Sequence, residues 1–221
     1  AAGVEVIEAA EKGQDILLQV KGFFAPAPLI HDAPIKGDAG EADEPEVEPV
    51  SRMGEFLFSN FRQGHHLVFA NARSTVEGTT DRLRRACERA RVPNSFHPHH
   101  GSLSREIREA TEAALRDDSR PATSISTSTL ELGIDLGAVE SVVQLGAAPT
   151  VSSLRQRMGR SGRRGSASVL HVLIEEAEIG PDTPFARRFR FELFEAVAQV
   201  ELLLEGWCEP PTPGALHLST L

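Results

Sequence analysis

The chain has 221 residues, of which 40% are hydrophobic, and its formal net charge is −9. This length allows one or two domains, and the apolar fraction is enough for a packed core. The two cysteines, Cys87 and Cys208, are too few for a disulfide framework or a metal-binding knuckle, and no long apolar run or signal-like leader is present. We therefore expect a cytoplasmic protein with reduced thiols and no membrane contact.

Negative charge is concentrated in residues 38–48, which contain six acidic side chains and no Lys or Arg. Removing these six charges from −9 leaves −3 for the rest of the chain. The arginines are clustered elsewhere, within residues 82–91, 105–120, 155–164 and 187–190. Because a phosphate responds to the local field rather than to the total charge, the acidic balance does not exclude a nucleic-acid partner.

The first 50 residues contain two short strand candidates, at 4–7 and 16–20, and then a segment from 25 to 50 with five prolines and the acidic run. Such a composition cannot bury enough apolar surface to order itself, so we predict a loop or disordered linker. Within it, the Asp-Glu-Pro-Glu run at 43–46 is a superficial candidate for a magnesium-binding acidic pair. No hydrophobic strand precedes this run, so we interpret it as part of the linker.

From residue 51 onward, helical and strand patterns alternate. A helix at 51–62 ends before Gly64. The pattern after it predicts strands at 66–70, 95–98, 122–126, 140–145 and 168–174, and helices at 75–91, 103–117 and 151–159. Strands separated by helices predict an α/β fold with a parallel sheet and right-handed crossovers, although 122–126 is unusually polar for a central strand. A long helix with apolar residues on more than one side is predicted from 185 to 204.

Three histidines stand close together in the run His97-Pro98-His99-His100 and could be imagined as metal ligands. No cysteine or acid cluster accompanies them, so we predict no metal site here. We expect a strand-end turn instead, in which Gly101 lets the backbone approach a ligand.

The segment most informative about chemistry contains Arg157, Arg160, Arg163 and Arg164, interleaved with glycines. Two glycines in four positions disfavour a continuous helix, so a short helix from about 152 that breaks near Gly162 fits better. Guanidinium groups that converge on one point bind phosphate strongly. The alternative is a solvated basic patch. The glycine spacing and the strand-like residues before the helix favour a phosphate site.

Four runs, in order along the chain, are similar to motifs of superfamily 2 helicases. Residues 67–73 resemble motif IV, residues 99–104 the following His-Gly segment, residues 126–135 motif V, and residues 156–163 (Gln-Arg-Met-Gly-Arg-Ser-Gly-Arg) motif VI. Their wording is closest to the large helicase-related (Lhr-like) branch of the DEAD/DEAH-box helicases. The chain lacks the Gly-x-x-x-x-Gly-Lys-[Ser/Thr] phosphate loop of a first motor domain. The resemblance therefore implies a second RecA-like domain, a P-loop NTPase fold without its own P-loop, which is not expected to hydrolyse ATP unaided.

The resemblance also implies a nucleotide site shared with the first motor domain. Arg160 and Arg163 match the motif VI arginines that reach the γ-phosphate of ATP, which that partner domain binds together with Mg²⁺. Arg157 is expected to anchor motif VI to its own domain. Three further positions match nucleotide contacts, namely Gln156, Gly133 and Asp135.

A second set of positions matches contacts to one strand of DNA or RNA. Arg73, Gly101 and Thr127 offer a guanidinium, a bare backbone and a hydroxyl, which bind phosphate without reading bases, as a translocase requires. They follow the carboxyl ends of predicted strands, where the loops of a parallel sheet form a common surface. Ser102 could add main-chain donors aimed at a phosphate. Alternatively it is the N-cap of the helix at 103–117, for which Ser104 is the better candidate.

We divide the chain into three parts. Residues 1–50 form N-terminal strands and a linker from a missing first motor domain, 51–183 the RecA-like domain, and 184–221 a helical extension that leads to a downstream module. We expect the C-terminal motor domain of an ATP-dependent helicase or translocase that acts on single-stranded nucleic acid, DNA if the Lhr-like resemblance holds. The alternative is a stand-alone nucleic-acid-binding or regulatory module without ATPase activity. Arg160 and Arg163 favour the first, because a domain that only binds needs no pair aimed at a γ-phosphate.

Overall fold

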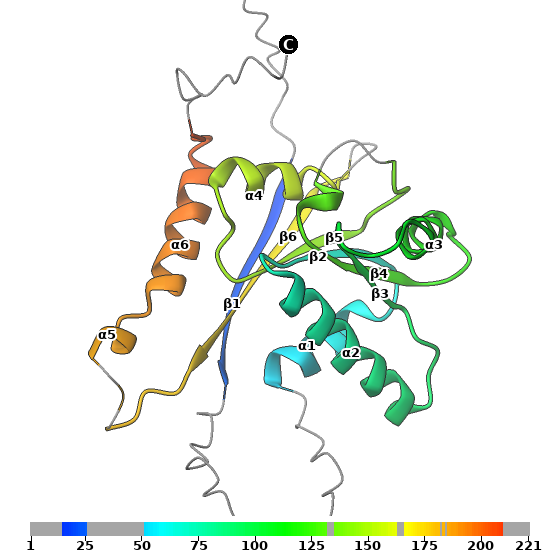
Figure 1. Ribbon diagram of the computed structural model, residues 1–221. Coiled ribbons are helices and arrows are strands. Elements are labelled where there is room, and N and C mark those ends of the chain that lie inside the picture. Colours follow the sequence, from blue (N-terminus) through cyan, green and yellow to red (C-terminus); the bar gives the residue numbers. More distant parts are fainter. Residues whose placement is uncertain are drawn as a thin grey trace, which may run out of the picture.

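A parallel sheet of six strands lies at the centre of the computed structural model, which describes residues 15–25, 51–131, 135–162, 166–181, 183 and 185–209 (Figure 1). The strands are β1 (Ile16–Ala25), β2 (His65–Phe69), β3 (Phe96–His99), β4 (Ala122–Ser126), β5 (Ser141–Leu145) and β6 (Ser168–Ala177). Their order across the sheet is β1-β6-β5-β2-β4-β3, and every neighbouring pair is parallel. The predicted α/β fold, a parallel sheet flanked by helices, is confirmed.

Helices cover both faces of the sheet, because successive side chains of a strand point to opposite faces. The main helices are α1 (Arg52–Phe61), α2 (Arg73–Ala90), α3 (Arg105–Arg116), α4 (Val151–Met158) and α6 (Phe191–Leu204). Val68 of β2 packs in one core cluster with α1 and α2, whereas Leu67 and Phe69 join a second cluster with α3, α4 and α6. Every residue of β2, β4 and β5 is buried, as expected for strands covered on both sides.

The helices and strands predicted between residues 51 and 174 all form, with ends that shift by three residues at most. The polar segment 122–126 is the strand β4, and all five of its residues are buried. The hydroxyl of Thr123 donates to the Phe61 carbonyl oxygen at 2.6 Å, so this polar group is satisfied inside the core.

The strand β1 is longer than the strand predicted at 16–20, and it pairs with β6 from Ile16 to Ala25. The length of β6, which continues to Ala177, supplies β1 with a hydrogen-bonding partner for all ten residues. β1 is therefore an edge strand of the sheet, although its residues lie in the N-terminal part of our division. The boundaries of the three parts remain a proposal.

The single long helix predicted from 185 to 204 is wrong, because the structure divides it into α5 (Phe185–Arg188) and α6. Arg190, at the break, has φ −79° and ψ 63°, which is not a helical conformation. Its Nη1 atom donates to Glu176 Oε2 at 2.6 Å, and its guanidinium lies 4.9 Å from the centroid of the Phe24 ring. These contacts with β6 and β1 override the local helical preference.

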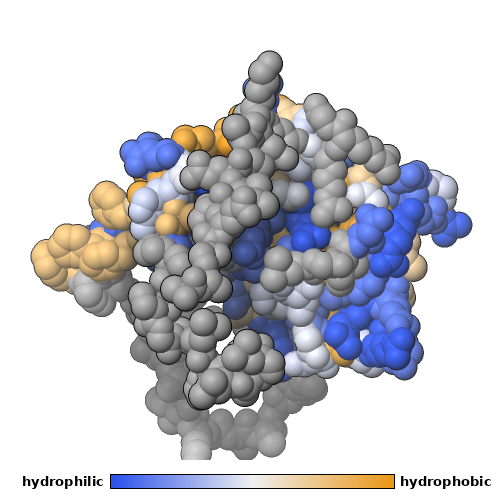
Figure 2. Space-filling view, turned by 90° about the horizontal axis from the view of Figure 1, so that it is seen from above, coloured by the Kyte–Doolittle hydropathy of each residue, from blue (hydrophilic) through white to orange (hydrophobic). Residues whose placement is uncertain are grey.

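Aromatic side chains remain exposed on this C-terminal extension, where Phe191 and Phe194 are 66% and 67% exposed. Figure 2 shows hydrophobic residues gathered on the side of α5 and α6 and hydrophilic residues on the side of α2 and α3. The apolar residues of the extension thus occupy more than one side, as the sequence pattern predicts.

Several predicted features lie outside the described residues, namely the strand at 4–7 and the proline-rich acidic segment with its run at 43–46. Among the helices that are described, none combines the length and the apolar character needed to cross a lipid bilayer.

Candidate nucleotide and nucleic-acid interface

The four residues predicted to contact nucleic acid follow three adjacent strands of the sheet. Arg73 begins α2 after β2, Gly101 and Ser102 follow β3, and Thr127 follows β4. Arg73 Nη1 donates to the hydroxyl oxygen of Ser102 at 2.5 Å, and the N–H of Thr127 donates to the His99 carbonyl oxygen at 3.2 Å. The parallel sheet therefore brings these positions, up to 54 residues apart in sequence, to one edge.

The two serines of this turn have different partners. Ser104 is the N-cap of α3, and its side-chain oxygen accepts the Ile107 N–H at 3.4 Å. Ser102 precedes the cap and accepts the bond from Arg73 instead. The hydroxyl of Ser102 is thus part of the edge that carries Arg73, which leaves its expected role toward a phosphate as a proposal.

Three of the five residues predicted to contact nucleotide are described, and Gly133 and Arg163 lie outside the described residues. Gln156 is exposed on α4, and Arg160 follows the helix, where its Nε atom donates to the Glu131 carbonyl oxygen at 2.8 Å. Asp135 lies at the end of α3, where its carbonyl oxygen accepts a bond from Arg116 Nε at 2.8 Å. Motifs V and VI are therefore in direct contact through Glu131 and Arg160.

Arg157 points the opposite way, into the core, and is 1% exposed. Its Nε atom donates to Glu131 Oε1 at 2.7 Å, its Nη2 atom also donates to that oxygen, and its Nη1 atom donates to Gln144 Oε1. The guanidinium lies 5.0 Å from the ring centroid of Phe69, in the range of a cation–π contact. These contacts join α4 to β5, β2 and motif V, which is the anchoring expected of Arg157.

The family model for the helicase conserved C-terminal domain matches residues 49–165. This span is more than half of the chain and contains every predicted site residue. The chain belongs to this family.

Two curated relatives and one solved structure place this helicase C-terminal domain more closely. It is 40% identical over 98 residues to the ATP-dependent helicase Lhr-Core of Methanothermobacter thermautotrophicus, covering 44% of the chain and 11% of the relative. It is 37% identical over 115 residues to the Lhr helicase/uracil glycosylase of Escherichia coli, covering 52% of the chain and 7% of the relative. The structure of Mycobacterium smegmatis helicase Lhr bound to ssDNA and AMP-PNP matches with a TM-score of 0.65 and 29% identity, over 89% of this chain and 22% of that one.

These matches confirm the predicted RecA-like fold and the Lhr-like branch of superfamily 2. The chain spans about a tenth or less of the length of these two curated relatives.

Two residues that hold the helicase domain's site together were not predicted from the sequence. Glu131 lies inside motif V, and its Oε1 atom accepts bonds from Arg157 and, at 3.0 Å, from the hydroxyl of Ser153. Gln144 is fully buried in β5 and accepts a bond from Arg157. One signal was available, because a glutamine inside a strand expected to be buried on both faces requires a hydrogen-bonding partner.

The loop that leads into α4 is held by the C-terminal extension of the helicase domain. The side-chain amide of Gln199, on α6, accepts the Ala148 N–H at 2.8 Å and donates to the Ala148 carbonyl oxygen at 2.7 Å. The amide of Asn71 donates to the Ala147 carbonyl oxygen at 2.7 Å. Gly146, which begins this loop, has φ +71°, a conformation that favours glycine. α4 therefore starts from a loop that is fixed to both α6 and the end of β2.

Glu209 caps the first turn of α4. Its carboxylate accepts bonds from the N–H groups of Val151 and Ser152, at 2.7 and 2.9 Å, and from the Ser152 hydroxyl at 2.7 Å. The hydrogen bond from the Ser152 side chain is the largest of the effects that lower the pKa of Glu209 to about 2. A negative charge at this end of a helix is favourable because the N–H groups there are otherwise without partners.

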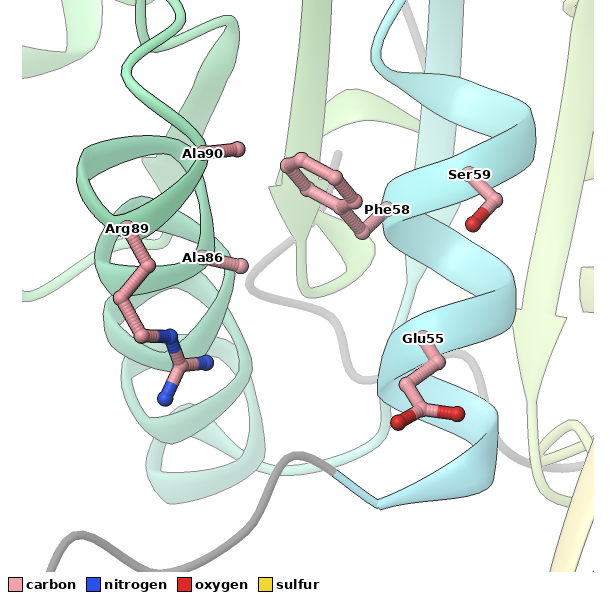
Figure 3. A pocket seen from close by; sticks show the side chains of 6 residues that line it. All are labelled: Glu55, Phe58, Ser59, Ala86, Arg89 and Ala90. Atoms are coloured by element: carbon pink, nitrogen blue, oxygen red, sulfur yellow. The ribbon is translucent and has the colours of Figure 1, made fainter.

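Neither of the two cavities found among the described residues contains a predicted site residue. One, of about 460 Å³, lies between α1 and α2, where the Phe58 side chain extends toward Ala86 and Ala90 (Figure 3). The other, of about 660 Å³, lies where β3 and β4 begin and is lined in part by Asn94 and His97. The candidate site of this helicase domain is therefore a surface rather than an enclosed pocket.

We expect Arg157→Ala to lower the free energy of unfolding by about 3–5 kcal/mol, because the Glu131 carboxylate would stay buried without its charged partner. Urea unfolding followed by circular dichroism measures this loss. Arg155→Ala, on the same helix but half-exposed, should cost less than about 1 kcal/mol. Equal shifts of the unfolding midpoint in the two variants would contradict the anchoring role.

We expect the stabilisation from Glu209 to depend on pH. Because the pKa is lowered from 4.5 to about 2, the carboxylate contributes fully above about pH 4.5, and its contribution is lost as the pH falls toward 2. Carboxyl ¹³C NMR of Glu209 should show that Ser152→Ala moves the midpoint upward. Ser153→Ala is the control, because that hydroxyl binds Glu131 instead. Equal midpoints in both variants would contradict the assignment to Ser152.

Proposed function

We propose that this chain is the second RecA-like motor domain of an ATP-dependent helicase or translocase that acts on single-stranded nucleic acid, namely DNA. The observation that carries the proposal is the arrangement of α4: Arg157 is anchored in the core, while Gln156 is exposed and Arg160 is held beside motif V. Such an arrangement offers a guanidinium from a rigid support to a phosphate bound on another domain. The relatives named as ATP-dependent helicases support this function.

In this proposal ATP and Mg²⁺ are bound mainly by the first RecA-like domain of the same protein. ATP supplies the phosphoryl group whose transfer to water drives movement. Arg160 and Arg163 neutralise the charge that develops at the γ-phosphate. The remaining nucleotide contacts come from Gln156, Gly133 and Asp135. The exposed amide of Gln156 and the guanidinium of Arg160 are donors, which fits them to phosphate oxygens, and the Lhr neighbour was solved with AMP-PNP.

The nucleic-acid strand lies, in this proposal, over the sheet edge formed by Arg73, Gly101, Ser102 and Thr127. A Cβ atom added at Gly101 would meet no atom of the chain within 4 Å, so the space above it is open to a ligand backbone. Arg73 and Ser102 already contact each other and can bind one phosphate together. Such contacts grip the backbone without reading sequence. The Lhr neighbour was solved with ssDNA, which supports DNA as the ligand.

We expect Arg160→Ala, in the chain joined to its first RecA-like domain, to reduce ATP turnover by about a thousandfold, the scale of an arginine finger. Binding of single-stranded DNA should remain nearly intact. A coupled ATPase assay and fluorescence anisotropy measure the two activities, with Arg155→Ala as the control from the same helix. Equal loss of both activities would point to a folding role for Arg160. A two-domain protein that binds DNA but hydrolyses no ATP would favour the stand-alone binding module instead.

We expect Arg73→Ala to weaken binding of single-stranded DNA and to reduce the slope of log K against log salt by about 0.7, because one phosphate contact is lost. Anisotropy titrations at several salt concentrations measure this slope. Arg85→Ala is the matched control, since Arg85 is on the same helix but pairs with Asp81 at 2.9 Å. A slope unchanged by Arg73→Ala would remove Arg73 from the contacts to nucleic acid.

A further inference from the structure

Glu131 binds both described arginines at the carboxyl end of α4, through different atoms. Its carboxylate accepts bonds from Arg157 and Ser153, whereas its main-chain carbonyl oxygen accepts the bond from Arg160 Nε. The residue is 9% exposed, and Arg157 is 1% exposed. The carbonyl that holds Arg160 therefore belongs to a residue whose side chain is fixed inside the domain.

Glu131 is also tied to the edge that carries the nucleic-acid residues. It ends the 3₁₀ turn η1 (Ser128–Leu130), which follows Thr127, and its own N–H donates to the Ser128 carbonyl oxygen at 3.0 Å. Within that turn, the hydroxyl of Thr129 lies 2.8 Å from Nδ1 of the buried His99, the last residue of β3. The chain from Thr127 to Glu131 is thus one short, hydrogen-bonded turn without a flexible spacer.

The anchor of Glu131 reaches the same edge by a second route. Arg157 lies over the ring of Phe69, the last residue of β2, and Arg73 begins α2 four residues later. A displacement of either Thr127 or the end of β2 therefore acts on the group that fixes Glu131. No comparable connection is needed for stability alone, because a buried ion pair can often be replaced by apolar side chains of similar size.

We propose that Glu131 is a positioning residue that sets the place of Arg160 and makes that place depend on the strand bound at Thr127 and Arg73. The inference rests on the proposed function and adds to it the route by which single-stranded DNA stimulates ATP turnover. The carboxylate, held by Arg157 and Ser153, fixes the carbonyl; the carbonyl fixes Arg160. A shift of about 1 Å in a group that acts on the transition state costs on the order of a hundredfold in rate.

The test uses the chain joined to its first RecA-like domain and the double variant Glu131→Leu with Arg157→Met. This variant removes both buried charges together and fills the space with apolar side chains, so neither charge is left unpaired. We expect its melting temperature and its KM for ATP to stay close to those of the parent protein. Its kcat with single-stranded DNA should fall on the order of a hundredfold, and the stimulation by DNA should be lost.

A double variant that keeps both the parent kcat and the stimulation by DNA would overturn the inference, since the pair would then serve stability alone. Should the double variant fail to fold, Ser153→Ala takes its place, because it removes one bond to Glu131 without a change of charge. We expect a loss of about fivefold in kcat at unchanged KM, the factor that corresponds to one hydrogen bond. An unchanged kcat in folded Ser153→Ala protein would overturn the inference as well.

Arg160→Ala, measured in the same two-domain protein, separates this inference from the proposed function. If Arg160→Ala leaves kcat intact, the proposed function fails. If Arg160→Ala abolishes turnover while the Glu131 variants keep both kcat and stimulation, only the positioning role of Glu131 fails.

Discussion

A buried ion pair between Glu131 and Arg157 decides how the ligand-binding parts of this domain are arranged. Removing an arginine from water is costly, and the structure offsets that cost with bonds to Glu131 and Gln144 and with the face of the Phe69 ring. Because these partners come from motif V, β5 and β2, burial of Arg157 fixes three segments relative to α4. It also fixes the rotation of the helix, since Arg157 can point inward only if Gln156 is turned toward solvent. Glu209 at the first turn and Glu131 near the last turn hold the two ends of α4.

The two predicted sets of ligand contacts depend on different physical supports. The nucleic-acid set depends on the strand order β2-β4-β3, which brings loops from distant parts of the sequence to one edge of the sheet. The nucleotide residue Arg160 depends instead on a helix end and on one main-chain carbonyl. Glu131 belongs to both arrangements, because it ends the turn that begins after Thr127 and it contacts Arg160. A motor that couples strand binding to ATP turnover needs such a shared element, and here it is a single residue.

Local sequence patterns were sufficient to predict the sheet, because alternation of strands and helices from residue 51 is a property of neighbouring residues. They also placed Arg73 and Ser102 at the same edge, since the loops of a parallel sheet emerge together. The pairing of Glu131 with Arg157 and Gln144 could not be derived in this way, because it depends on which strands lie side by side. The break at Arg190 was missed for the same reason: Glu176 and Phe24, which hold its side chain, are distant in sequence. Long-range partners, rather than propensities, account for what the sequence alone did not predict.

The most direct test of the central claim is a structure of the two-domain protein with single-stranded DNA and a non-hydrolysable ATP analogue. Our account predicts that a guanidinium nitrogen of Arg160 lies at hydrogen-bond distance, about 3 Å, from a γ-phosphate oxygen. In the same structure, Arg160 Nε should still donate to the Glu131 carbonyl oxygen, and Arg157 should remain buried. The account is contradicted if Arg160 turns into its own domain while the γ-phosphate is surrounded by residues of the first domain alone.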